Sequence, residues 1–261
     1  PFEAVVVDNR PNDDSVRRLA ESAGARYLSR PDNPGYGAAM NAGAALLSPT
    51  VEWVLIANPD LVLTPGSVAT MAARAAGDPT IAAVGPLVRE SDGSVYPSAR
   101  AVPSIRNGIG HALFVNLWPN NPWTRNYRDD SPTTPALKDA GWLSGSCLLV
   151  RRSAFDAIGG FDERYFMYFE DVDLGFRFGR AGFRNVYDPA AEVTHSGAHA
   201  TGRDGAAMIR AHHSSARRFL ERKYPGAVLW PVRFVLGVGL RIRSDLITRR
   251  LQRQTAADPA V

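Results

Sequence analysis

The sequence predicts an α/β protein in which a mixed, mostly parallel sheet is flanked by helices and followed by amphipathic C-terminal helices. Short apolar runs alternate with stretches of helical periodicity, the pattern of strands joined by crossover helices. Polar residues follow two of these runs directly, at Asp8-Asn9 and at Asn58-Pro59-Asp60. From Gly205 onward the pattern becomes helical and basic. A chain of 261 residues is long enough for one large α/β domain, or for one domain with an appendage.

Strands are predicted where apolar residues run on without interruption, because strands buried on both faces of a parallel sheet lack a polar side. The predicted strands are Phe2–Asp8, Arg26–Ser29, Glu52–Ala57, Ile81–Val88, Trp142–Arg151 and Arg184–Val193. Ser91-Asp92-Gly93 has the composition of a turn. Ligands of such sheets bind beyond the carboxyl ends of the strands, which is where Asp8-Asn9 and Asn58-Pro59-Asp60 are expected.

Helices are predicted between these strands, over Ser15–Ala23, Tyr36–Leu47 and Pro65–Ala76. Gly24 closes the first of them, and an Asn-Pro-Gly turn opens the second. The stretch Ala101–Lys138 differs, because Pro, Asn, Trp and Asp dominate it and periodicity is weak. A long loop of this kind in a compact domain is usually functional or mobile.

One further helix is predicted to start at Asp171 and to stop at Gly182, with apolar residues repeating at i,i+4 between them. Its beginning carries carboxylates, which the helix dipole stabilises there: Glu170, Asp171 and Asp173. Asp171 stands beside an aromatic run, which is a good place for a proton acceptor. An N-cap followed by a solvated acidic turn explains the same residues, so the pattern alone leaves both interpretations open.

Charge is unevenly distributed along the chain. The formal net charge is +4, and Arg and Lys far outnumber Asp and Glu after residue 200, which predicts an anionic surface or substrate as partner. Val228–Leu251 is apolar but broken by Pro and Arg, which favours a basic helix in a membrane interface over a spanning helix. A helix packed on its own domain or on a second subunit stays an alternative. Cys147 is the single cysteine, which favours a reducing compartment. No evident base stands beside it, so we interpret it as a buried thiol and not as a nucleophile.

Other stretches offer binding chemistry, and each also has a purely structural explanation. Asp60 can hold a divalent cation that bridges a diphosphate, or it can belong to a β-turn. His195 can be a second metal ligand, or an ordinary surface or core histidine. The Gly- and Ala-rich stretch Asn33–Gly43 can receive phosphate at a helix N-terminus, or allow close helix–sheet packing. The stretch from Trp142 to Cys147 can border a sugar, or form a core strand with a buried Trp.

Taken together and in this order, the motifs resemble the family 2 glycosyltransferases with the GT-A fold, over about residues 2 to 220. The motifs are Asp8-Asn9 after a strand, Asn33-Pro34-Gly35-Tyr36-Gly37 with Asn41, Asn58-Pro59-Asp60, Trp142–Ser146, Gly159–Leu174 and Val193-Thr194-His195. Within the family, the chain is most similar to actinobacterial rhamnosyltransferases of the cell-wall linker. Those enzymes move L-rhamnose from dTDP-L-rhamnose to N-acetylglucosaminyl-diphospho-polyprenol. Two stretches carry this closer likeness, Asp92–Arg100 and His199–Asp204.

The resemblance implies roles for the matched positions. Asp171 of the Glu170–Asp171 pair is implied to be the general base of an inverting transfer. Asp60 and His195 are implied to hold Mg²⁺ or Mn²⁺ on the donor diphosphate. The residues implied to bind the nucleotide-sugar donor are Asp8, Asn9, Gly35, Gly37, Asn41, Asn58 and Asp60. Those implied to border the acceptor sugar are Trp142, Ser144, Gly145 and Asp173. Asn58 departs from the usual Asp-x-Asp, which leaves fewer charged ligands for the metal.

We therefore expect a GT-A catalytic domain over residues 1–204 and a basic, helical, membrane-associating region over residues 205–261. The domain is expected to be N-terminally incomplete, because the family's first strand and helix are absent. Expected partners are a nucleotide-sugar donor, a polyprenyl-diphosphate-linked sugar and the cytoplasmic face of the plasma membrane, with no nucleic acid and with self-association left open. Two alternatives remain. One is a transferase that uses UDP-galactofuranose, UDP-glucose or GDP-mannose, and the other is a nucleotide-sugar-binding protein without catalysis.

Overall fold

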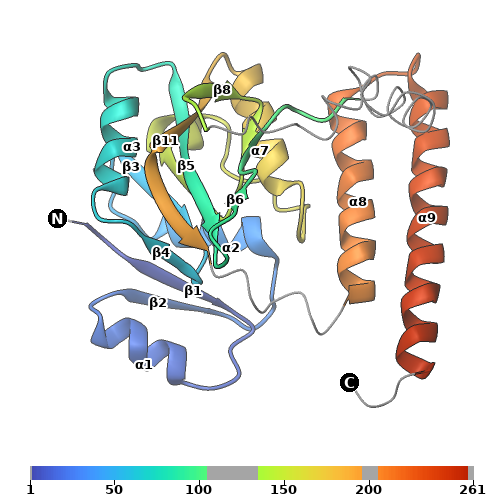
Figure 1. Cartoon of the computed structure of the whole chain (residues 1–261), viewed down its shortest axis with the longest axis horizontal. Coiled ribbons are helices and arrows are strands. Elements are labelled where there is room, and N and C mark those ends of the chain that lie inside the picture. The colour runs from blue at the N-terminus through green and yellow to red at the C-terminus, as the bar shows by residue number, and fades with distance from the viewer. Residues whose placement is uncertain (1, 105–134, 196–204, 258–261) are drawn as a thin grey trace. The chain divides into compact units, whose positions relative to one another are not determined.

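A computed structural model of the chain describes residues 2–104, 135–195 and 205–257 (Figure 1). The chain divides into two compact units, each discontinuous in sequence. The first unit comprises Pro1–Leu47, Phe161–Asp173 and Ala198–Val261, and the second comprises Ser48–Gly160 and Leu174–Gly197. This partition follows contacts and not function, so the predicted division after residue 204 stays a prediction. Most of the predicted 101–138 loop and the stretch His199–Asp204 lie outside the described residues.

The second unit is built on a seven-stranded mixed sheet. The order is β3 (Trp53–Ala57), β10 (Cys147–Arg151), β5 (Ile81–Glu90), β11 (Arg184–His195) and β4 (Leu61–Leu63), with β6 (Val95–Tyr96) on β5 and β8 (Lys138–Ala140) on β11. β7 (Ala99–Arg100) and β9 (Trp142–Leu143) form a separate antiparallel pair. α3 (Ser67–Ala76) packs on β5, β10 and β11, and α6 (Arg152–Ala157) follows β10.

The core of this unit lies where α3 covers the sheet. Met71 from α3 packs with Val84, Leu149 and Val186 from three strands, and all four are buried. The uninterrupted apolar run predicted as a strand from Ile81 is buried from Ile81 to Val88, as expected for a strand covered on both faces. Cys147 is buried in β10, and burial raises the pKa of its thiol to about 12, which agrees with an unreactive thiol.

The sheet is mixed, as predicted, but parallel pairing is less extensive than the alternation of strands and helices indicated. Among the described strands, β5 pairs with β11 in parallel, whereas β10 is antiparallel to both β3 and β5. The reason lies in the connection that precedes β10. Neighbouring parallel strands require a crossover connection, usually a helix, whereas the sequence between residues 101 and 138 has little helical periodicity and so does not predict a parallel entry of β10.

The first unit contains a two-stranded parallel sheet of β1 (Val5–Asn9) and β2 (Arg26–Arg30). Within the described residues these strands pair only with each other, although the sequence suggested one common sheet. α1 (Ser15–Ser22) packs on β2, and α2 (Tyr36–Ala45) packs closely on β1. The predicted positions of all four elements are therefore confirmed to within a few residues.

Two long helices complete the first unit, α8 (Gly205–Lys223) and α9 (Trp230–Ala257), and they lie side by side (Figure 1). They confirm the helical pattern predicted from Gly205 onward. No helix in the described part of the chain has both the length and the apolar character needed to cross a bilayer.

Candidate functional site

The predicted carboxylates lie at the end of a segment, Phe161–Asp173, that belongs to the first unit and is called the carboxylate segment below. Its backbone turns through Tyr168 and Phe169, which both have φ of 66°. This left-handed conformation is costly for bulky side chains and persists only where surrounding contacts enforce it. The next residue, Glu170, begins α7 (Glu170–Arg180), and Gly182, two residues after the helix, has φ of 87°. The predicted helix, its acidic first turn and its glycine stop are thus confirmed.

Glu170 and Asp171 differ in their surroundings. Glu170 is 7% exposed, and its Oε2 atom has no hydrogen-bond partner among the described residues. Burial, together with the neighbouring charge of Asp171, raises the pKa of Glu170 to about 8. Asp171 is half-buried and accepts a hydrogen bond from the Val172 amide at 2.8 Å. A pair in which one carboxyl favours its protonated form while the other carries the charge suits a single proton acceptor.

Asp173 is fully buried, and its carboxylate is held by two other side chains. Arg222 of α8 forms an ion pair with it through Nε at 2.8 Å, and the Tyr165 hydroxyl donates to it at 3.3 Å. These contacts are those of a residue that orders the segment, and the predicted role of Asp173 at the acceptor stays a prediction. The sequence interpretation missed Arg222 and Tyr165. The available signal was the helical spacing of Ser215, Phe219 and Arg222 along one side of α8.

The donor residues predicted after the first strand lie together at the end of β1. Asp8 accepts a hydrogen bond from the Tyr27 hydroxyl at 3.0 Å. Asn9 donates from Nδ2 to the Gly35 carbonyl at 3.3 Å, while its buried Oδ1 has no partner among the described residues. Gly35 precedes α2 with φ of 99°, and a side chain there would collide with the Phe166 carbonyl. Only glycine fits this approach to a helix N-terminus, which is consistent with the predicted anion site without testing it.

Gly37 and Asn41, predicted on the donor side, contact the start of the carboxylate segment. A Cβ atom on Gly37 would lie 2.9 Å from the Phe161 Cβ atom. Asn41 donates to the Phe161 carbonyl at 2.9 Å and accepts from the Phe161 amide at 2.8 Å. Both residues therefore fix α2 against this segment, and their direct contact with a donor stays a prediction.

The predicted metal ligands Asp60 and His195 come together in the second unit. β11 pairs with β4 in the register His195↔Leu61, which puts the histidine next to Asp60. The His195 Nε2 and Asp60 Oδ1 atoms are 3.1 Å apart, and the side chains are 18% and 37% exposed. An imidazole and a hard carboxylate oxygen form a donor set that fits Mn²⁺ or Mg²⁺. Within the described residues no three His, Cys, Asp or Glu side chains gather into a fuller set, so substrate oxygens or water would have to complete it.

The predicted acceptor residues in the second unit lie around β9, and Asn58 lies nearby. Trp142 is half-buried, and its indole donates to the Ala101 carbonyl at 3.1 Å. Ser144 and Gly145 are buried, and the Ser144 hydroxyl shares a 3.0 Å hydrogen bond with Ser146. The backbone N–H of Asn58 donates to the Ser146 carbonyl at 2.9 Å. The strand end that carries Asn58 and Asp60 is thus tied to the Ser-Gly-Ser stretch.

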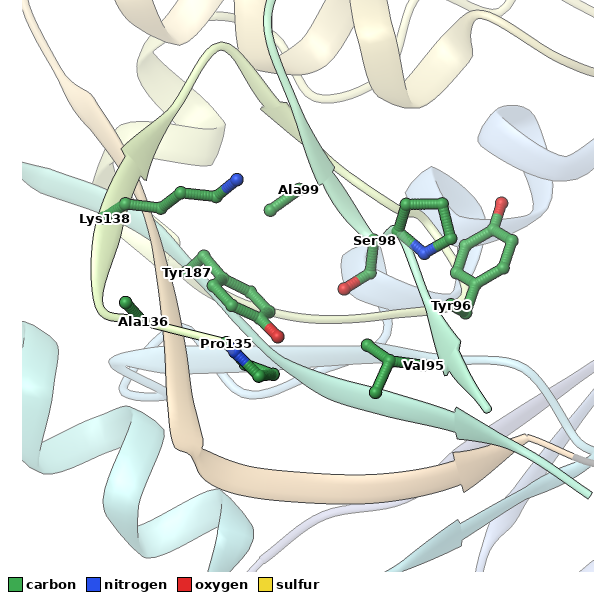
Figure 2. Close-up of a pocket in the computed structure, with 9 residues that line it drawn as sticks. Val95, Tyr96, Ser98, Ala99, Pro135, Ala136, Lys138 and Tyr187 are labelled. Carbon is green, nitrogen blue, oxygen red and sulfur yellow. The ribbon is translucent and has the colours of Figure 1, made fainter. Parts of the chain in front are cut away.

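The second unit also contains a small pocket whose walls are shown in Figure 2. Val95 and Ser98 stand on one side, and Lys138 and Tyr187 stand on the other. None of the predicted site residues is among the described residues that line it. The structure therefore brings together Asp60 with His195 in one unit and Glu170 with Asp171 in the other. That both pairs face one sugar stays a prediction.

Comparison with known proteins adds a family match. Residues 1–214 match the model of a family described as glycosyltransferase-like family 2. The chain is 45% identical, over 98% of its length and 86% of the relative, to an N-acetylglucosaminyl-diphospho-decaprenol L-rhamnosyltransferase of Mycobacterium tuberculosis. A rhamnosyltransferase of Escherichia coli, WbbL, is 43% identical over 31% of this chain and 31% of the relative.

Solved structures support the fold. A mannosyltransferase of Pyrobaculum calidifontis in complex with GDP-Man and Mn²⁺ matches with a TM-score of 0.53 and 17% identity. GalNAc-T7 with UDP, GalNAc and Mn²⁺ matches with a TM-score of 0.54 and 14% identity. The match to the mannosyltransferase covers 99% of this chain and 66% of the mannosyltransferase chain. The match to GalNAc-T7 covers 93% of this chain and 48% of the GalNAc-T7 chain. The predicted GT-A architecture is confirmed by these likenesses, which carry no more than the fold.

Proposed function

Because the chain belongs to glycosyltransferase-like family 2 and is a glycosyltransferase, we propose that it moves L-rhamnose from dTDP-L-rhamnose to N-acetylglucosaminyl-diphospho-polyprenol, with inversion at the anomeric carbon. The observation that carries this proposal is the identity of 45% over nearly the whole chain with a relative whose name states that sugar and that class of acceptor. The half-buried Asp171 beside the buried, proton-holding Glu170 supplies the chemistry that an inverting transfer requires.

Each residue group has a role in this proposal. Asp171 accepts the proton of the acceptor hydroxyl as that oxygen attacks the anomeric carbon. Asp8, Asn9 and the turn at Gly35 hold the nucleotide side of the donor. Asp60 and His195 would hold a divalent ion, and such an ion would offset the charge that develops on the leaving diphosphate.

A donor panel tests the proposal. The chain is incubated with a synthetic N-acetylglucosaminyl-diphospho-polyprenol and, in separate reactions, dTDP-L-rhamnose, UDP-galactofuranose, UDP-glucose or GDP-mannose. Mass spectrometry and NMR of the product identify the sugar and the anomeric configuration. Transfer of rhamnose with inversion is expected. Transfer from another donor favours the second enzyme hypothesis, and donor binding without product favours a non-catalytic protein.

We also propose that α9 rests on the cytoplasmic face of the plasma membrane, where a lipid-linked acceptor is held. Trp230, Phe234, Val238 and Ile242 recur every fourth residue, and each is between 42% and 57% exposed. Such a stripe on a basic helix is typical of an interfacial helix. Sedimentation with anionic vesicles should be lost when Phe234 and Val238 are both changed to Ser. It should persist after Leu19→Ser, which changes an exposed apolar residue on α1.

A further inference from the structure

One side of α8, from His212 to Arg222, contacts the carboxylate segment. Four residues at helical spacing make these contacts: His212, Ser215, Phe219 and Arg222. The Ser215 hydroxyl donates to the Met167 carbonyl at 2.9 Å. The His212 ring centroid lies 5.5 Å from that of Tyr168 and 5.4 Å from that of Phe169. The strained turn that precedes Glu170 is therefore supported from α8.

Arg222 stands out among these residues because it bridges two acids at opposite ends of the segment. Its guanidinium pairs with Asp162 near the beginning and, through Nε at 2.8 Å, with Asp173 at the end. Asp162 is 10% exposed and Asp173 is 0% exposed. Buried carboxylates are tolerated when a well-placed cation pairs with them. Loss of the bridge therefore removes that compensation from Asp173, whereas Asp162 keeps its ion pair with Arg164 at 2.6 Å. A planar guanidinium can serve both acids at once.

We propose that Arg222 is a positioning residue for glycosyl transfer. By joining Asp162 to Asp173 it fixes both ends of the segment, and thereby holds Glu170 and Asp171 in the geometry that proton transfer requires. This inference rests on the proposed function, which gives Asp171 its role. Arg222 acts through Asp173 and not on the substrate. Without the bridge, the left-handed turn at Tyr168 and Phe169 relaxes and displaces the base.

The kinetic test compares Arg222→Met, Arg222→Lys and the matched control Arg217→Met. Arg217 lies on the same helix, and the ion pair that it forms within the described residues is an exposed one, with Glu221. Because small displacements of a catalytic group are costly, kcat of Arg222→Met should fall about 10- to 100-fold, with KM for the donor within about twofold. Arg222→Lys should fall between that variant and the wild type, and Arg217→Met should match the wild type. Rates are expressed per donor-binding site from a binding titration, so that unfolded chains do not count.

Hydrogen exchange provides a readout that is independent of activity. Amides of residues 162–173 should exchange faster in Arg222→Met than in the wild type, while those of β5 and β10 keep their protection. The proposal would be overturned if Arg222→Met had the same kcat and the same amide exchange rates as the wild type. It would also be overturned if exchange became faster throughout the chain, because that indicates general destabilisation. If Arg222→Met does not fold, a wild-type kcat in Arg222→Lys would overturn it. Failure of the proposed function is recognised separately, since the wild type would then transfer no rhamnose.

Discussion

The carboxylate segment and the Asp60–His195 pair, which are the two groups proposed to carry the chemistry, are built in opposite ways. Asp173 is fully buried and held by Arg222 and Tyr165, and a strained backbone turn leads into Glu170. Asp60 and His195 stand at strand ends, partly exposed, and are joined by a 3.1 Å contact. A group that must meet one proton in one geometry gains from rigid support. A pair that shares a metal with substrate oxygens needs free coordination positions and access.

The largest expected effect is at Asp171, the proposed base. Asp171→Asn removes the proton acceptor and keeps the shape of the side chain, so turnover should fall about 100- to 10,000-fold while donor affinity stays near the wild-type value. Rhamnose transfer and donor binding are measured on the same preparation. Glu163→Gln, which changes an exposed carboxylate on the same segment, serves as control. Near-normal turnover of Asp171→Asn would show that Asp171 is not the base, and the carboxylate segment would then lose its proposed catalytic role.

Variants of the Asp60–His195 pair should change how turnover depends on the metal concentration. Asp60→Asn and His195→Ala each remove one donor of a small protein set, so the Mn²⁺ concentration for half-maximal turnover should rise about 10- to 100-fold. Excess Mn²⁺ should restore part of the rate in these variants and none in Asp171→Asn. If excess Mn²⁺ restored the rate equally in all three variants, or in none of them, the proposed difference in role between the Asp60–His195 pair and the carboxylate segment would be contradicted.

The two regions also differ in how well the sequence predicted them. The acidic helix start and the glycine stop follow from local rules, since periodicity, the helix dipole and a left-handed C-terminal residue all act within a few positions. The meeting of Asp60 and His195 depended on family resemblance, because only the β4–β11 register brings residues so distant in sequence together. Arg222 was missed because its helical spacing with Ser215 and Phe219 indicates a shared side of α8 but does not reveal that this arginine pairs with Asp162 and Asp173.

Sheet topology shows the same limit. Most of the predicted strand positions are confirmed, and β5 and β11 pair in parallel, but the predicted strand Trp142–Arg151 is wrong as one strand. It is divided at Ser144–Ser146 into β9, which pairs with β7, and β10, which lies in the main sheet. The direction of β10 could not be predicted, because the sequence of the long connection before it, residues 101–138, has little periodicity.

A smaller effect is expected from the titration of Glu170. Its pKa in the folded chain is raised from 4.5 to about 8, so the protonated form is favoured by folding. The resulting stabilisation is complete below the unfolded pKa and is lost as the pH rises towards about 8. Glu170→Gln cannot ionise, so the stability of the wild type should fall relative to this variant by at most about 1.4 kcal/mol per pH unit across that window. Urea unfolding at several pH values measures the difference, and parallel curves would show that Glu170 is not a buried proton carrier.

The smallest effect is expected where the rigid region has several supports. Ser215→Ala removes one hydrogen bond, from a buried hydroxyl to the Met167 carbonyl, and should lower the free energy of unfolding by about 1 kcal/mol. The ring contacts of His212 with Tyr168 and Phe169 and the Arg222 bridge remain, so turnover should stay within about threefold of the wild type. A loss as large as that of Arg222→Met would mean that the supports act as one cooperative unit. The rigidity of the segment would then depend on the whole face of α8 and not mainly on the buried ion pairs.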